Sequence, residues 1–438
     1  MCWDRILIGF QVFLLALIIF LEMHRRQGKN LIAILLFGTS LILVQFQAWY
    51  IAGDLETSDW VVYLNNIITR EGFKLANLLV FISVVISFTV YLTLPVKRAP
   101  VLHKMNVGHA LREFSLPYMV VGLLVLTSAA LLFHLLGGLH GVLSAPGRMV
   151  GGQTLLLTII QLGKMPLLHK IATKRSPIIL DWALMGVSML IVMFNSRFLT
   201  IYMIVQYLVL YHYCIREISL KQFLIFGGLA TAVILGYGSL RHYTNFYTTY
   251  TLENILRYFR EGTSGEGFNF IAFFYRHNVE GFSGFAGIIT AYIEQRGMAH
   301  DFGLYNLSLF TQLIPYALRQ AAFGDIVNTL EAIYPYHGSV VAPGYENAFA
   351  HFGFPGVVMF ALLLAFLPRW MHYKLISERR DKLIYGILAP HILTLIRGTF
   401  RNVLFFGLAD LCLVILYRII LTGCRDVMYR YMHYETPQ

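Results

Sequence analysis

Long runs of apolar residues recur along the whole chain, and they constrain its fold more than any other feature. Several runs reach the roughly 20 residues that an α-helix needs to cross a bilayer. Of the 438 residues, 57% are hydrophobic and only 13% are charged, whereas soluble domains carry roughly 25% charged residues. No ten-residue alternation typical of a membrane β-barrel is present. We therefore expect an all-α, polytopic membrane helix bundle.

Eleven apolar segments are predicted to cross the membrane, with a long loop between the eighth and the ninth. The loop, Arg241–Tyr345, is 105 residues long. It separates an N-terminal bundle of about eight spans (1–240) from closing transmembrane helices (346–438), and it forms a subdomain of its own (241–345). The predicted spans are Ile6–Met23, Leu31–Ile51, Leu75–Leu94, Pro117–Leu136, Thr154–Leu168, Ile178–Met193, Phe198–Cys214, Phe223–Leu240, Ala348–Leu367, Leu383–Ile396 and Val403–Leu421.

The distribution of lysine and arginine predicts the orientation of the chain. One alternating set of segments, which includes Lys164, contains 21 of these residues, and the other set contains seven when the long loop is left out. Cytoplasmic segments carry the excess of positive charge. We therefore expect the N-terminus outside, the C-terminus in the cytoplasm and the long loop outside. This distribution accounts for the net charge of +11, so the charge does not indicate nucleic-acid binding.

The long loop is rich in arginine and in aromatic residues. It carries six arginines and no lysine, and its aromatic stretches include Phe268–Tyr275. Gly284–Tyr292 and Leu304–Ala322 are apolar enough to form short helices lying on the outer mouth of the bundle. Sugars can lie on aromatic faces, although the same residues are also typical of an interfacial belt.

Arginine also occurs in very short turns on the expected outer face, where the charge rule disfavours it. Guanidinium groups are always charged and bind phosphate oxygens bidentately, so we expect an anionic lipid diphosphate as their partner. Alternatively, these arginines pair with loop acids or contact lipid headgroups. They are Arg197, Arg397 and Arg401 in the short turns, and Arg241, Arg257, Arg260, Arg276, Arg296 and Arg319 in the loop.

Three side chains near the outer mouth can transfer a proton: His337 in the loop, Glu346 where the ninth span begins, and His351 further in. Attack of a sugar hydroxyl on an anomeric carbon needs a base near that hydroxyl and positive charge near the departing group. Glu346 and His337 are the expected catalytic groups. The alternatives are a turn histidine at His337, a buried structural histidine at His351 and a structurally paired carboxylate at Glu346.

The densest acidic cluster on the expected outer face is Asp54–Asp59, in the first outer loop. Such oxygens can bind a divalent cation, or they can form a solvated acidic turn. The four cysteines (Cys2, Cys214, Cys412 and Cys424) show no disulfide or metal spacing. No phosphate-binding loop or zinc motif is present. We expect neither a metal nor a cofactor, and we expect the N-terminal apolar run to be retained as the first span.

Two stretches carry a family resemblance. Asn195–Thr200 (NSRFLT) leads into an apolar span, and Tyr345–Gly356 (YENAFAHFGFPG) follows the long loop. They resemble, respectively, the Ser-Arg-Gly pattern and the acidic residue before an aromatic-Gly-x-x-Gly helix start in polysaccharide polymerases of the Wzy type and, more distantly, in O-antigen ligases. Phe198 replaces the usual glycine, and Glu346 stands about one residue from the family's acidic position. The order of spans, late outer loop and closing helices is also similar.

The resemblance implies a metal-independent, inverting glycosyltransferase. It would move a glycan from undecaprenyl diphosphate to a new lipid-linked repeat unit at the outer face of the bacterial cytoplasmic membrane, as in O-antigen synthesis. Arg197 would grip the donor diphosphate, Glu346 would be an acid near the acceptor, and His337 is the nearest counterpart of the ligases' loop histidine. Tyr345 and the other arginines would bind substrate. A chain-length regulator protein and membrane lipid are further expected partners.

Three alternatives stay open. An O-antigen ligase would use lipid A core as its acceptor. A transferase that uses a lipid-phosphate sugar would depend on Asp54 and Asp59. A transporter of the lipid-linked glycan would place ionisable residues near the middle of the bilayer and show repeated halves, and neither feature is evident from the sequence.

Overall fold

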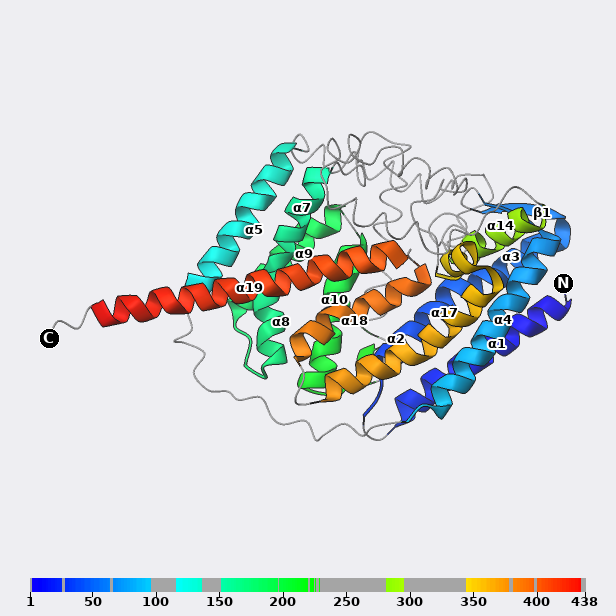
Figure 1. Cartoon of the computed structure of the whole chain (residues 1–438), viewed down its shortest axis with the longest axis horizontal. Coiled ribbons are helices and arrows are strands. Elements are labelled where there is room, and N and C mark those ends of the chain that lie inside the picture. The colour runs from blue at the N-terminus through cyan, green and yellow to red at the C-terminus, as the bar shows by residue number, and fades with distance from the viewer. Residues whose placement is uncertain are drawn as a thin grey trace, which may run out of the picture. The chain divides into compact units, whose positions relative to one another are not determined.

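A computed structural model describes residues 2–25, 28–63, 66–95, 116–135, 151–195, 197–219, 221–223, 225, 228, 281–294, 344–377, 381–397 and 400–434. The described part is almost entirely helical (Figure 1). Its longer helices are α1 (Cys2–His24), α2 (Leu31–Ser40), α3 (Phe46–Thr57), α4 (Arg70–Thr93), α5 (Leu116–Leu135), α7 (Gly151–Ile160), α8 (Met165–Ala172), α9 (Ile179–Asn195), α10 (Arg197–Cys214), α14 (Phe282–Ile293), α17 (Gly344–Ile376), α18 (Lys382–Arg397) and α19 (Phe400–Tyr434).

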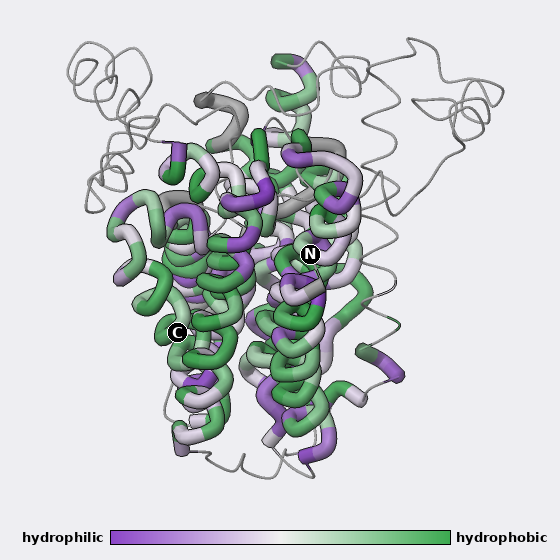
Figure 2. Tube along the Cα trace, turned by 90° about the vertical axis from the view of Figure 1, so that its right-hand side faces the viewer, coloured by the Kyte–Doolittle hydropathy of each residue, from purple (hydrophilic) through white to green (hydrophobic). Residues whose placement is uncertain are grey.

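Seven helical segments within the described residues are long and apolar enough to span a membrane, which confirms an all-α, polytopic membrane bundle. The long helices are coloured mainly as hydrophobic along their length in Figure 2. Three more predicted spans coincide with shorter apolar helices, whereas Phe223–Leu240 lies mostly outside the described residues. The seven segments are Trp3–His24, Leu31–Thr57, Arg70–Thr93, Leu116–Leu135, Leu155–Ala172, Gly344–Ile376 and Val403–Asp426.

The chain forms two compact units that are not continuous in sequence. Unit 1 comprises Met1–Ala99, Gly238–Tyr373 and His391–Phe405. Unit 2 comprises Pro100–Tyr237, Lys374–Pro390 and Phe406–Gln438. The last three helices therefore each contribute to both units.

Buried amides connect α1 and α4 in unit 1. The Gln11 side chain donates to Asn77 Oδ1 over 2.9 Å, and the Asn77 amide donates to the Asp4 carbonyl over 3.1 Å. Gln11 is 1% exposed and Asn77 is fully buried. In a lipid environment, apolar burial does not by itself select a helix partner, so such hydrogen bonds contribute to choosing it.

A short antiparallel hairpin, which was not predicted from the sequence, follows α3. Strands β1 (Trp60–Tyr63) and β2 (Asn66–Thr69) pair with Trp60 opposite Thr69. The Thr69 amide donates to Thr290 Oγ1 of α14 over 3.2 Å. The hairpin therefore connects α14, which lies within the long loop, to the N-terminus of α4.

Helix α14 confirms that Gly284–Tyr292 forms a short helix within the long loop. Its first ten residues are all buried, and it contacts α3, α4 and β2 (Figure 1). Gln47 of α3 binds the start of α14, because its side chain accepts from the Ser283 amide over 3.0 Å and donates to Ser283 Oγ over 3.2 Å. The bond from the Ser283 amide satisfies a backbone N–H group that has no partner within the helix.

Unit 2 is built around α5, α7, α8, α9 and α10, with segments of α18 and α19. A 3₁₀ turn, η2 (Gln161–Lys164), separates α7 from α8. The core of the unit includes Val121, Leu162, Met203 and Ile387, each of which is fully buried. Because this core is aliphatic, any polar group buried inside the unit needs a hydrogen-bond or ion-pair partner.

Candidate functional site

Helix α17 contains the predicted acidic residue, and it reverses direction near its start. Gly353 has φ 63° and ψ −147°, a conformation that is essentially restricted to glycine. In a straight helix, residues 345 and 360 would lie about 22 Å apart. Instead, the rings of Tyr345 and Phe360 lie 4.8 Å apart. The segment from Gly344 to Phe352, here called the short arm, therefore folds back along the rest of α17.

The short arm is fixed by contacts with α14 and α4. The Phe285 ring of α14 lies 5.8 Å from the Tyr345 ring and 6.2 Å from the Phe349 ring. Ser83 of α4 donates to the Tyr345 hydroxyl over 3.3 Å. Tyr345 is only 2% exposed, so it serves as a packing and hydrogen-bonding residue for the arm.

The short arm brings three polar side chains into a buried environment. Glu346 is 6% exposed, Asn347 is 1% exposed and His351 is fully buried. A carboxylate and an imidazole can each accept a proton from a substrate hydroxyl. Burying a charged group is costly unless partners compensate, so each of these side chains needs polar partners.

The arm also lies against the end of α18 within unit 1. A Cβ added to Gly344 would overlap the Leu395 carbonyl oxygen, so the two backbones are in direct contact. Leu395 is two residues before Arg397, the last residue of α18. The fold thus brings the backbone that carries Glu346 close to the end of α18, where Arg397 lies.

The predicted arginines of the short turns lie at helix ends. Helix α9 ends at Asn195 and α10 begins at Arg197, while α18 ends at Arg397 and α19 begins at Phe400. Arg197 is thus the first residue of its helix, and Arg401 is the second residue of α19. Helix N-termini carry partial positive charge, so a cation placed there is unfavourable unless an anion compensates.

The predicted catalytic residue His337 and the five substrate-binding residues of the loop lie outside the described residues. Their roles remain predictions. The loop residues are Arg241, Arg257, Arg260, Arg276 and Arg319.

The acidic cluster Asp54–Asp59, at the end of α3 and in the loop before β1, makes local contacts. Tyr63 donates to Asp54 over 2.5 Å. Glu56 pairs with Arg5 over 3.1 Å, and Asp59 pairs with Arg70 over 3.5 Å. These contacts tie the loop to α1, β1 and α4, which supports a structural role for the cluster.

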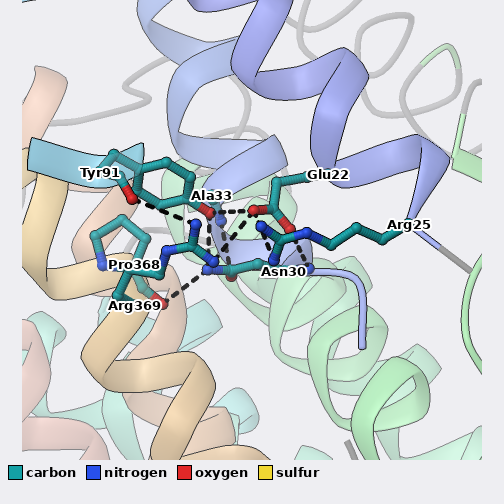
Figure 3. A network of polar contacts seen from close by, with 7 residues as sticks. All are labelled: Glu22, Arg25, Asn30, Ala33, Tyr91, Pro368 and Arg369. Carbon is teal, nitrogen blue, oxygen red and sulfur yellow. Dashed lines mark hydrogen bonds and ion pairs between the residues drawn. The ribbon is translucent and has the colours of Figure 1, made fainter. Parts of the chain in front are cut away.

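A buried charge network at the other end of α4 was not predicted (Figure 3). Glu22 accepts from the Tyr91 hydroxyl over 2.8 Å and pairs with Arg25 over 3.0 Å and with Arg369 over 3.2 Å. The backbone amide of Asn30 also donates to Glu22 over 3.2 Å. The Arg369 guanidinium lies 3.9 Å from the centre of the Tyr91 ring. Glu22 is 1% exposed, so two guanidiniums share one buried carboxylate.

A second buried charge pair corrects the assignment of Lys164 to the cytoplasmic charges. Lys164 lies inside the span Leu155–Ala172 and is fully buried. Its ammonium pairs with Asp410 over 2.7 Å and donates to Gln161 over 3.1 Å. Gln206 donates to the other Asp410 oxygen over 2.7 Å. The sequence held a signal for this pair, because both charges interrupt predicted spans and such charges need partners.

The resemblance of Asn195–Thr200 and Tyr345–Gly356 to Wzy-type polymerases is a prediction from the sequence alone. In comparisons with protein-family models, with curated proteins and with solved structures, no match to the chain is found.

Proposed function

We propose that this multi-pass membrane protein is a polysaccharide polymerase. It joins undecaprenyl-diphosphate-linked repeat units into a longer glycan at the outer face of the bacterial cytoplasmic membrane. The observation that carries the proposal is the contact between the short arm of α17, which bears Glu346, and the end of α18, which bears Arg397. Glycosyl transfer from a diphosphate needs a base near the attacking hydroxyl and positive charge near the departing group, which a carboxylate and an arginine can supply.

The reaction is a direct displacement at the anomeric carbon. An acceptor hydroxyl attacks this carbon, Glu346 takes the hydroxyl proton, and the bond from carbon to the diphosphate oxygen breaks. The diphosphate leaves with the bonding electrons, and the configuration at the carbon inverts. Charge grows on the departing oxygen in the transition state, so arginines that bind this charge better than the ground state accelerate the step.

Arg401 is suited to binding the departing group because it lies at a helix N-terminus in unit 1, the unit that also holds Glu346. Arg197 begins a helix of unit 2, and its role in binding the diphosphate is the one that the family resemblance implies. The amides of a helix N-terminus and a guanidinium both favour an anion. Arg397 lies at a helix C-terminus, where an arginine also stabilises the helix itself. We therefore expect Arg197 and Arg401 to be more sensitive to substitution than Arg397.

The test is chain length in cells that depend on this protein for their glycan. Arg197→Ala and Glu346→Gln are expected to abolish long chains and to leave single-repeat products. The rate loss is about 10²–10³ for the arginine, as for a removed charge-stabilising donor, and about 10²–10⁴ for the carboxylate, as for a removed general base. The control is Arg425→Ala, whose side chain is 78% exposed and which should leave chain length unchanged. Membrane level is measured for every variant. Normal chain length in membrane-inserted Arg197→Ala and Glu346→Gln cells contradicts the proposal.

A transporter of the lipid-linked glycan is a second candidate, and the buried Lys164–Asp410 pair favours it. Ionisable residues within membrane spans commonly mark transport pathways. The two functions differ in what accumulates when the pair is replaced by Lys164→Met with Asp410→Leu. A transporter would leave lipid-linked repeat units on the inner face, whereas a polymerase that uses the pair only for packing would keep making long chains.

A further inference from the structure

A basic pocket in unit 2 lies between the end of α8, the start of α18 and the middle of α19, and its lining contains none of the predicted catalytic residues. Its volume is about 360 Å³, within the size range of small-molecule sites. The pocket is lined by His169 near the end of α8, Lys174 just after it, Asp381 and Lys382 at the start of α18, and Arg418 of α19. All five residues belong to unit 2.

The charge of the lining favours an anion. Lys174, Lys382 and Arg418 supply three cations against the single carboxylate of Asp381. That carboxylate is already engaged, because one of its oxygens pairs with Arg418 and the other accepts from the Leu383 amide over 3.2 Å. Within the part of the chain that the structure describes, neither Lys174 nor Lys382 forms an ion pair. The pocket therefore retains excess positive charge in half-buried side chains.

The backbone conformation at Lys174 also favours an anion-binding pocket. Helix α8 ends in a Schellman motif, in which the Arg175 amide donates to the Lys170 carbonyl over 2.8 Å and the Lys174 amide donates to the Ile171 carbonyl over 3.0 Å. Glycine usually occupies the left-handed position of this motif, but here Lys174 has φ 58°. A lysine at this position is unfavourable for the backbone, and it places an ammonium at the pocket.

We infer that this pocket binds a phosphate group. The ammonium groups of Lys174 and Lys382 and the guanidinium of Arg418 provide donors that suit phosphate oxygens. Ala172, which lines the pocket, is the last residue of the span Leu155–Ala172, and basic pockets between helices at a span end bind anionic headgroups. The phosphate comes either from the headgroup of an anionic phospholipid or from a soluble phosphate compound. This inference does not depend on the proposed polymerase activity.

The test measures binding to the full-length purified protein in two arms. In the lipid arm, phosphatidylglycerol is added in detergent, and its retention is followed by native mass spectrometry and its effect on melting temperature by a thermal scan. In the soluble arm, inorganic phosphate and diphosphate replace the lipid. The variants are Lys174→Gly, Lys382→Gln and, as the matched control on α19, Arg425→Gln, which lies outside the pocket.

Lys174→Gly is the decisive variant, because it removes the charge while giving the Schellman motif its preferred residue. It is expected to weaken phosphate binding about tenfold or more, as for loss of a charged hydrogen bond, without lowering the melting temperature of the ligand-free protein. Lys382→Gln should weaken binding similarly, and Arg425→Gln should not. Binding in the lipid arm alone assigns the site to a headgroup, and binding in the soluble arm assigns it to a free phosphate compound. No binding in either arm, or equal binding by all variants, overturns the inference.

Discussion

Replacing Asp410 with asparagine removes the negative charge that Lys164 faces inside unit 2. The ammonium is fully buried, and Asp410 is 4% exposed, so water cannot take over its role. Removing one member of a buried ion pair lowers the free energy of unfolding by about 3–5 kcal/mol. At roughly 2–4 °C per kcal/mol for a domain of 150–250 residues, the melting temperature in detergent should fall by about 6–20 °C. Lys164→Met should destabilise the protein for the same reason.

The double variant, Lys164→Met with Asp410→Leu, distinguishes a charge effect from a packing effect. Replacing both members of a buried pair by apolar residues of similar size is often neutral or stabilising. Gln206 then loses its bond to Asp410 but keeps its bond to the Ile387 carbonyl, at 3.0 Å, so a remaining cost of about 1–3 kcal/mol is expected. The double variant should therefore be more stable than the two single changes predict when added.

The measurement is a thermal scan of detergent-solubilised protein followed by size-exclusion chromatography. Asp426→Asn is the control, because the Arg425–Asp426 pair is 3.8 Å long with both side chains more than half exposed, and exposed pairs contribute little. A melting temperature unchanged by Asp410→Asn would refute the reasoning. A double variant whose loss of melting temperature equals the sum of the two single losses would also refute the reasoning.

Two further changes test the buried elements of unit 1 by the same scan. Glu22→Gln should cost about 3–5 kcal/mol, because it leaves two buried or half-buried guanidiniums beside a neutral amide, whereas Glu56→Gln, in a pair 35–43% exposed, should change stability by less than about 1 kcal/mol. If Glu22→Gln and Glu56→Gln lower the stability equally, the Glu22 network does not stabilise the protein as proposed. Gly353→Ala should cost about 1–3 kcal/mol because of its backbone angles. Gly186→Ala, at a helical glycine with open space around it, should instead be neutral or stabilising by about 0.5–1 kcal/mol; a harmless Gly353→Ala would contradict the fold-back.

The helices could be predicted from the sequence because apolar length is a local property. A run such as Leu75–Leu94 meets the requirement for a span without reference to any other part of the chain, and α4 occupies it. The apolar segment Gly284–Tyr292 was predictable as a helix in the same way. The hairpin was missed although Trp60–Tyr63 and Asn66–Thr69 are rich in aromatic and β-branched residues, which are typical of strands.

The buried charge pairs could not be assigned from the sequence, because their partners are distant along the chain. Lys164 and Asp410 are 246 positions apart, and no periodicity relates them. The cost of an isolated charge in a membrane predicts that each needs a partner, but it does not identify which one. For the candidate site, the position of Glu346 at a helix start was predictable, whereas its place on an arm that folds back depends on the backbone angles of Gly353.

The two buried charge clusters have a common consequence for the architecture. Helices within lipid gain little from apolar contact with each other, because lipid tails are equally apolar. The Glu22 network therefore helps select which helices meet in unit 1, and the Lys164–Asp410 pair does so in unit 2. Arg369 lies 16 residues beyond Gly353 on α17, or about 24 Å along the helix. The network thus holds one end of the helix whose other end carries Glu346, so a loss of Glu22 should displace the short arm as well as lower stability.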